Sequence, residues 1–277
     1  MANLGSIPPL TQKGDLILSD ELNHASIIDA CKLSGARILV YRHNDGSDLA
    51  KKIRQKADRK FIVTEGIFSM NGDFANLRVV SEIANKNNAT LVLDDAHGDF
   101  VTGCDGRGSA EHLGVANKID IYVSSLSKGL GAFGGYIATR SKIRELIINT
   151  SRPFIYTSAL PSFLVELALE RFSSKREKHR KKLWNNVKMM QKGLCSIGYV
   201  FNSPSHIIPI IIGSEKKVMK FGKYLFDNGI FAQPIRYPTV AIGSARIRIS
   251  LTALLAERDI EKSICVFESA GKKFGIL

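Results

Sequence analysis

Two short stretches decide the fold of this chain, TLVLDDAH at Thr90–His97 and DIYVSSLSK at Asp120–Lys128. Each begins with an apolar run that is typical of a buried strand and ends with polar side chains. Ligands of open α/β sheets bind beyond the carboxyl ends of the strands, so we expect these polar residues to meet at one edge of a sheet. The two stretches therefore predict an α/β domain that carries a ligand site.

The sequence on either side repeats the alternation of strand and helix. Further strands are expected at 15–20, 36–41, 61–65 and 135–139, with helices at 25–33, 48–57 and 77–87 between them. Strands that are apolar on both faces, separated by helices, predict a buried parallel or mixed sheet. Two long helices, 161–172 and 175–197, come next, and a smaller α+β pattern begins at Ser205.

We therefore predict three regions. Residues 1–160 form a large α/β domain with a central mixed sheet, residues 161–200 form connecting helices, and residues 201–277 form a small α+β domain.

Composition indicates a folded globular protein with a basic surface. Hydrophobic residues make up 44% of the 277 and charged residues 23%, which argues against disorder. The formal charge of +13 attracts anions, but no nucleic-acid recognition motif is present. The densest basic run, Lys175–Lys182, has helical spacing and is interpreted as a solvated helix face.

Cysteine spacing and hydropathy exclude several other classes. The four cysteines form no CxxC pair, which argues against a zinc site and a disulfide framework, and no other metal site is expected. No apolar stretch approaches 18 residues, and the N-terminus lacks the features of a signal peptide. We expect a reduced, cytoplasmic protein without a membrane span.

Lys128 stands in a glycine-rich setting, SLSKGLGAFGG, where a flat ligand can approach closely. A lysine there can form a Schiff base with an aldehyde, and a carboxylate such as Asp94 on a neighbouring strand suits a pyridine nitrogen. Taken singly, a strand-end aspartate such as Asp94 is more often a helix cap or turn former, and a lysine such as Lys128 usually lies on the surface. Glycines 129, 131 and 134 match GxGxxG but lead into a strand, which excludes a dinucleotide fingerprint.

Five segments together resemble the α-oxoamine synthase family of pyridoxal-phosphate (PLP) enzymes. They are DELNHASIIDACKLSGA (20–36), TEGIFSMNGD (64–73), LDDAHGDFVTGCDGRGS (93–109), SLSKGLGAFGGY (125–136) and YPTVAIGSARIRISLTA (237–253). They occur in order over essentially the whole chain. The resemblance implies the aspartate aminotransferase-like fold, fold type I of the PLP enzymes.

The resemblance implies a role for each residue that would contact the cofactor. Lys128 would bind PLP covalently and later move the Cα proton, and Asp94 would pair with the pyridine nitrogen. His97 would hydrogen-bond the phenolic oxygen, and His24 would stack on the ring. Three hydroxyl groups complete the set: Ser69 on the cofactor, Ser125 on its phosphate, and Thr157 on the phosphate in a neighbouring subunit.

The resemblance also implies a substrate site. A planar guanidinium suits the amino-acid carboxylate, and both Arg246 and Arg248 lie on one predicted strand face. Spacing alone does not decide which of the two arginines binds the carboxylate, whereas the resemblance favours Arg248. Thr239 would lie near the substrate, and Glu65 would lie near the amino group, with a structural role as its equal alternative.

The implied reaction condenses an amino acid with an acyl-CoA and releases CoA and usually CO2. Within the family, the resemblance favours the members that use L-alanine and pimeloyl-CoA in biotin synthesis, because of the motifs DDAHG, TEGIFSMNGD and ARIRISLTA. Members that use glycine and acetyl-CoA are the alternative. A homodimer with shared active sites is expected, and a non-catalytic partner subunit is disfavoured because Lys128, Asp94 and His97 are all present.

Family members carry a further stretch before the segment that matches MANLG, and it includes a glycine-aromatic turn that binds the cofactor phosphate. A fragment, a misplaced start codon and a truncated gene are the three explanations of the missing stretch. If the chain is the complete natural product, phosphate binding would depend on Ser125 and Thr157. Loss of charge-assisted bonds at about 1.5–3 kcal/mol each would then weaken the affinity for the cofactor. An inactive fragment is therefore the alternative to an active enzyme.

Overall fold

The structure, a computed structural model, describes residues 1–277, which form two compact units. The first unit contains Met1–Phe68 and Phe74–Lys175, and the second contains Ser69–Asp73 and Arg176–Leu277. The chain therefore passes into the second unit at Lys175, within the segment for which the sequence predicts connecting helices. The inclusion of Ser69–Asp73 in the second unit is not indicated by the sequence.

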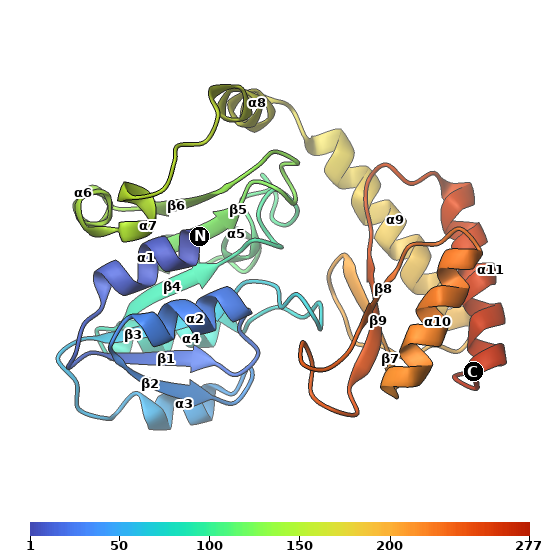
Figure 1. Ribbon diagram of the computed structural model, residues 1–277, viewed down its shortest axis with the longest axis horizontal. Helices are drawn as coiled ribbons and strands as arrows, with labels where there is room; N and C mark the ends of the chain where they lie inside the picture. The colour runs from blue at the N-terminus through green and yellow to red at the C-terminus, as the bar shows by residue number, and fades with distance from the viewer. The chain divides into compact units, whose positions relative to one another are not determined.

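A six-stranded mixed sheet forms the centre of the first unit, in the order β2-β1-β3-β4-β5-β6 (Figure 1). Five strands are parallel, and β6 pairs antiparallel with β5. The strands are β1 (Leu16–Asp20), β2 (Arg37–Tyr41), β3 (Lys60–Glu65), β4 (Thr90–Asp94), β5 (Ile121–Ser125) and β6 (Gly135–Thr139). The predicted α/β class and mixed sheet are confirmed.

Helices cover both faces of this sheet because alternate strand residues point to opposite faces. Ile17 packs in a cluster with residues of α1 (Ala2–Leu10), α2 (Ala25–Leu33) and α6 (Ser141–Thr150). Leu16 and Leu18 pack in the opposite cluster, with residues of α3 (Gly46–Lys52) and α4 (Leu77–Lys86). The apolar core therefore lies in two layers, one on each side of the strands.

Several helices differ from the predicted pattern. Helix α1 was not predicted because it contains Pro8 and Pro9, which cannot donate backbone hydrogen bonds and usually break a helix. The predicted 48–57 helix begins at Gly46, where Asp45 caps it, and ends at Lys52. The other elements between β4 and the second unit are α5 (Ser109–His112), a 3₁₀ turn (Ala116–Lys118), α6, α7 (Arg152–Ile155) and α8 (Ser162–Ser173).

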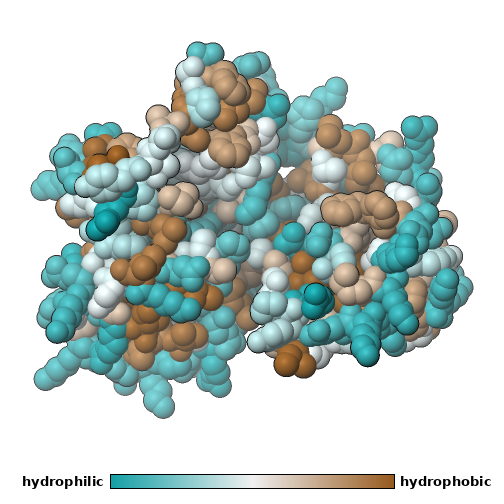
Figure 2. All heavy atoms as spheres, viewed as in Figure 1, coloured by the Kyte–Doolittle hydropathy of each residue, from teal (hydrophilic) through white to brown (hydrophobic).

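Helix α8 presents much of its apolar surface to solvent. In Figure 2 brown atoms gather over this helix. Phe163, Leu169 and Phe172 are each more than half exposed. No helix of the chain is both long enough and apolar enough to span a bilayer.

The second unit is built on a three-stranded antiparallel sheet in the order β7-β9-β8. Its strands are β7 (Ile207–Gly213), β8 (Gln233–Ile235) and β9 (Ala245–Ser250), and its helices are α9 (Glu177–Ser196), α10 (Glu215–Asp227) and α11 (Glu257–Phe274). On α9, Leu183, Val187, Met190 and Leu194 are buried at helical spacing. The basic start of α9 is partly neutralised because Arg180 and Lys181 pair with Glu177.

Asp95 anchors the carboxyl end of β4. Its side chain is fully buried and accepts hydrogen bonds from Ser109 N at 2.6 Å, Ser109 Oγ at 2.8 Å and Tyr122 Oη at 3.0 Å. A Cβ atom added at Gly66 or Gly98 would lie 2.1 Å or 2.2 Å from Asp95 Oδ1. These glycines are therefore needed for the close approach of the backbone to the carboxylate.

Burial raises the pKa of Asp95 to about 7, although the hydrogen bonds from Ser109 and Tyr122 oppose the shift. The folded chain therefore holds this proton more tightly than the unfolded chain, in which an aspartate has a pKa of about 3.9. The contribution of Asp95 to stability is present at low pH and is lost as the pH rises through about 7.

We predict that Asp95→Asn lowers the free energy of unfolding more at about pH 5 than at about pH 8, because only the wild-type carboxyl group titrates in that interval. Urea unfolding of wild type and variant at both pH values measures the loss of free energy of unfolding. Groups that titrate alike in both proteins contribute equally and cancel from this difference. Asp29→Asn, on the exposed face of α2, is the control and should show equal differences at both pH values. An equal or larger effect of Asp95→Asn at pH 8 would contradict the prediction.

Candidate active site

The parallel strands bring their polar carboxyl ends together in the first unit. Glu65 at the end of β3 pairs in register with Asp94 at the end of β4, and Asp94 pairs with Val123 of β5. Backbone hydrogen bonds from Gly66 N to Asp94 O and from Asp95 N to Val123 O, both 2.8 Å, continue this alignment beyond the strands. The edge predicted from the two stretches is thus where the polar residues meet.

A pocket of about 1000 Å³ lies at this edge. Its lining contains most of the predicted site residues: His24, Glu65, Asp94, His97, Ser125, Lys128 and Thr157. It also contains Asn3, Ser26 and Ser127, which the sequence analysis did not select. Thr157, expected to serve a neighbouring subunit, lines the pocket of its own chain.

Asp94 is held by hydrogen bonds on both carboxylate oxygens. Asn3 Nδ2 donates to Oδ2 at 2.7 Å, and Ala96 N donates to Oδ1 at 3.0 Å. Asn3 is only 5% exposed and its Oδ1 has no hydrogen-bond partner. The sequence gives no signal for Asn3, because the two prolines conceal the helix that carries it.

His24 begins α2 and caps its N-terminus. Ser26 N donates to His24 Nδ1 at 3.2 Å, and Ser26 Oγ lies 2.8 Å from the same nitrogen. Partial burial lowers the pKa of His24; the carboxylate of Asp94 opposes this shift and the charge of Lys128 adds to it. These effects favour a neutral imidazole at the pocket.

Ser125 and Ser127 form a pair of hydroxyls next to Lys128. Their Oγ atoms lie 2.8 Å apart, and Ser127 N donates to Ser125 Oγ at 3.3 Å. Gly134 and Gly135 line the same pocket and leave room beside these hydroxyls. This arrangement provides hydrogen-bond donors for an anionic group.

Ser69, Thr239 and Arg248 belong to the second unit. Within that unit, Arg246 donates from Nε to Ser244 O at 3.1 Å, and from Nη1 to Asn71 Oδ1 at 2.6 Å and to Met70 O at 3.2 Å. Arg248 makes a single longer bond of 3.4 Å to Ser69 O, and its buried Nε has no partner.

The two arginines thus differ in the number and length of their hydrogen bonds within the unit. Arg246 holds the 69–73 segment, whereas the guanidinium of Arg248 retains donors for a ligand.

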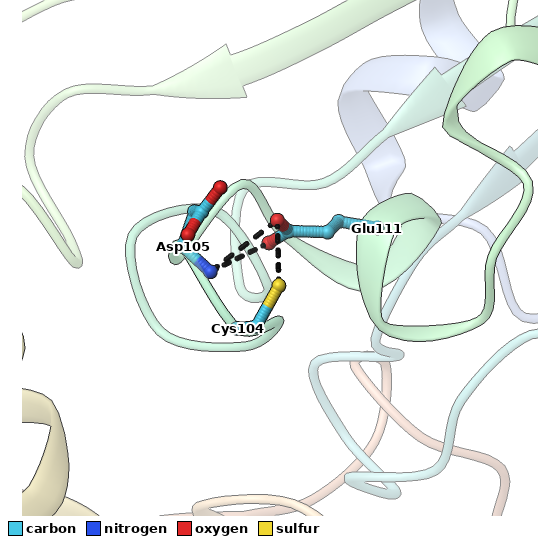
Figure 3. A group of neighbouring side chains, drawn as sticks. All are labelled: Cys104, Asp105 and Glu111. Atoms are coloured by element: carbon cyan, nitrogen blue, oxygen red, sulfur yellow. Dashed lines mark hydrogen bonds between the residues drawn. The ribbon is translucent and has the colours of Figure 1, made fainter.

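A further group of titratable side chains is formed by Cys104, Asp105 and Glu111 (Figure 3). None of the three lines the pocket. The Glu111 carboxylate accepts hydrogen bonds from Cys104 Sγ at 3.2 Å and from Arg107 N at 3.0 Å, and also from Asp105 N. The bond to Glu111 is the largest of the effects that raise the pKa of the Cys104 thiol. Glu111 therefore fixes the 104–107 loop.

Comparison with known proteins places this site in a family. Residues 2–267 match the aminotransferase class I and II family. An 8-amino-7-oxononanoate synthase of Thermoanaerobacter pseudethanolicus is 41% identical over 282 residues, which span 100% of this chain and 71% of that protein.

Two solved structures agree in fold. A serine palmitoyltransferase with PLP as an internal aldimine has a TM-score of 0.95 at 30% identity, covering 100% of this chain and 71% of that one. An 8-amino-7-oxononanoate synthase from Francisella tularensis has a TM-score of 0.84 at 30% identity, covering 98% and 80%.

The family match, the identity along the whole chain and the fold of PLP-containing structures agree with one another. The chain belongs to the aminotransferase class I and II family and is, within it, a PLP-dependent enzyme of the α-oxoamine synthase family.

Proposed function

We propose that the chain condenses L-alanine with pimeloyl-CoA, as an 8-amino-7-oxononanoate synthase does. A bond forms between the alanine Cα and the acyl carbon, while the thioester C–S bond and the Cα–carboxylate bond break, releasing CoA and CO2. The observation that carries the proposal is the pocket at the strand ends, which collects Lys128, Asp94, His97 and His24. The alanine and pimeloyl-CoA specificity is supported by the 41% identical relative.

The residues of the pocket suit PLP. A lysine amine, a buried carboxylate and a pair of serine hydroxyls match its aldehyde, ring nitrogen and phosphate respectively. Asn3 Nδ2 donates to the Asp94 carboxylate that would receive the ring nitrogen, and the buried Oδ1 of the same amide has no partner. When bound, PLP supplies an electron sink for charge that develops at the amino-acid Cα.

Each pocket residue has a distinct task in this proposal. Lys128 would hold the cofactor covalently and would move the proton at the amino-acid Cα. Asp94 would accept a hydrogen bond from the protonated ring nitrogen, and its two existing hydrogen bonds orient the carboxylate for this role. His97 would donate a hydrogen bond to the phenolic oxygen, and neutral His24 would contact the ring.

The remaining predicted residues bind phosphate or substrate. Ser125 and Thr157 bind the phosphate, and Ser69 contacts the cofactor. Arg248 binds the amino-acid carboxylate through the guanidinium donors that its own unit leaves open. Thr239 and Glu65 contribute to the substrate site.

We also propose that the chain functions as a homodimer. Phe154 and Tyr156, near the pocket residue Thr157, are each more than half exposed, as are several apolar residues of α8. Large exposed apolar side chains that gather in one part of the chain favour a subunit interface there. A second copy of the chain is the proposed partner.

The first prediction from this proposal concerns Lys128. Purified chain mixed with PLP should develop the visible absorbance of covalently bound cofactor, and Lys128→Ala should abolish it because Lys128 is the only lysine that lines the pocket. Lys118→Ala, at an exposed position of the same unit, is the matched control and should retain the band. A band that persists in Lys128→Ala would show that the cofactor is attached elsewhere.

The second prediction concerns substrate choice. The wild-type chain should release CoA from pimeloyl-CoA with L-alanine faster than from acetyl-CoA with glycine. Thiol release, followed colorimetrically with each pair, measures both rates. Turnover of glycine and acetyl-CoA alone would overturn the alanine and pimeloyl-CoA assignment while leaving the family unchanged.

The third prediction separates the two arginines. Arg248→Lys should lower kcat/KM for alanine by about tenfold to a hundredfold, equivalent to the loss of about 1.5–3 kcal/mol from charge-assisted hydrogen bonds. Arg246→Lys should instead lower the free energy of unfolding, because Arg246 is bonded within its own unit. Steady-state kinetics and urea unfolding of both variants provide the test, and a larger kinetic loss in Arg246→Lys would reverse the assignment.

A further inference from the structure

Helix α1 reaches the pocket through Asn3. Helices α1 and α2 pack against each other on one side of the sheet (Figure 1). From this position Asn3 Nδ2 donates one hydrogen to Asp94 Oδ2 at 2.7 Å and the other to Ser26 Oγ at 3.0 Å. Ser26 Oγ in turn lies 2.8 Å from His24 Nδ1. A continuous chain of hydrogen bonds therefore connects Asp94 with His24.

The donor and acceptor of each hydrogen bond in this network follow from the groups at its two ends, the Asp94 carboxylate and the Ser26 backbone N–H. The Asp94 carboxylate only accepts, so the Asn3 amide nitrogen faces it. The backbone N–H of Ser26 only donates, so His24 Nδ1, at 3.2 Å, has to be an acceptor. Because Ser26 Oγ accepts from Asn3, its single proton is available for the same Nδ1. Neutral His24 consequently carries its proton on Nε2.

We propose that Asn3 and Ser26 are positioning residues that hold His24 in the Nε2–H tautomer and orient the Asp94 carboxylate. The two groups assigned above to the ring face and the ring nitrogen are thereby fixed by one network. A role of this network in catalysis depends on the proposed PLP site. The assignment of the His24 tautomer does not depend on that site.

Protonation of His24 is disfavoured by the same network. An imidazolium donates from both nitrogens, so it would lose the hydrogen bonds that Nδ1 accepts from Ser26 N and Oγ. Partial burial lowers the pKa of His24 in the same direction, and Lys128 adds to this shift, whereas Asp94 opposes it. The network therefore keeps an uncharged ring at the pocket.

The test is ¹⁵N NMR of the chain without PLP, labelled at its six histidines and measured at about pH 8, where free histidine is neutral. The His24 signals are assigned by their loss in His24→Gln. Wild-type His24 should show an unprotonated Nδ1 and a protonated Nε2. Ser26→Ala should raise the Nδ1–H to Nε2–H ratio about fivefold, as expected for one hydrogen bond of typical net strength.

Matched variants separate positioning from general effects on the helix. Ser26→Thr keeps a hydroxyl and should restore the wild-type ratio. Ser34→Ala removes the hydroxyl that bonds Cys31 O and Ala36 N at the other end of α2 and should leave the ratio unchanged. Asn3→Ala should raise the ratio by less than Ser26→Ala, because it releases Ser26 Oγ without removing it.

A wild-type His24 protonated on Nδ1, or an unchanged ratio in Ser26→Ala, would overturn the proposal; an unchanged ratio in Asn3→Ala would remove Asn3 from the network. A second measurement, titration with PLP, should show dissociation constants about tenfold higher for Asn3→Ala than for wild type. If wild type itself binds no PLP, the proposed function fails while the NMR result still decides the tautomer.

Discussion

The structure of the site depends on two neighbouring carboxylates that face opposite ways at the end of β4. Asp95 is fully buried beneath the pocket and binds Ser109 and Tyr122, so it joins β4 to the start of α5 and to β5. This contact fixes the backbone on which Asp94 lies. Asp94 then points into the pocket, where Asn3 and Ala96 hold its two oxygens. The burial of one carboxylate thus determines the orientation of the other.

Much of the first unit could be predicted because its information is local. Strands β1 to β6 are short apolar runs bounded by turn residues. Runs that are apolar on both faces indicate strands covered by helices on both sides of the sheet. The carboxyl ends of parallel strands meet by geometry, so Asp94 and Lys128 could be placed at one edge without knowledge of any contact. Glu65, which only the resemblance indicated, ends β3, and the register places it opposite Asp94.

The parts that the sequence did not indicate depend on contacts between distant segments. Asn3 reaches Asp94 across 91 positions, and its helix contains prolines that propensity rules count against helix formation. The 69–73 segment belongs to the second unit because Arg246 binds Asn71, a contact spanning 175 positions. Spacing could not separate Arg246 from Arg248 either, since alternate strand residues share a face and only their partners differ.

The close approach of Gly66 and Gly98 to Asp95 has a consequence for sequence divergence. Gly108 is under the same restriction, because a Cβ there would lie 2.0 Å from Asp95 Oδ2. None of these glycines can gain a side chain while the carboxylate remains, and neighbours of Asp95 add to the restriction. A Cβ at Gly66 would also lie 2.1 Å from Ser109 Oγ, and one at Gly108 would also lie 2.6 Å from Tyr122 Oη. The three glycines should therefore change only together with Asp95, Ser109 and Tyr122, whose atoms occupy the space that a new side chain would need. All three glycines and Asp95 lie in two motifs that resemble the family, so a change in one motif is restricted by the other because both supply atoms to the same packed volume.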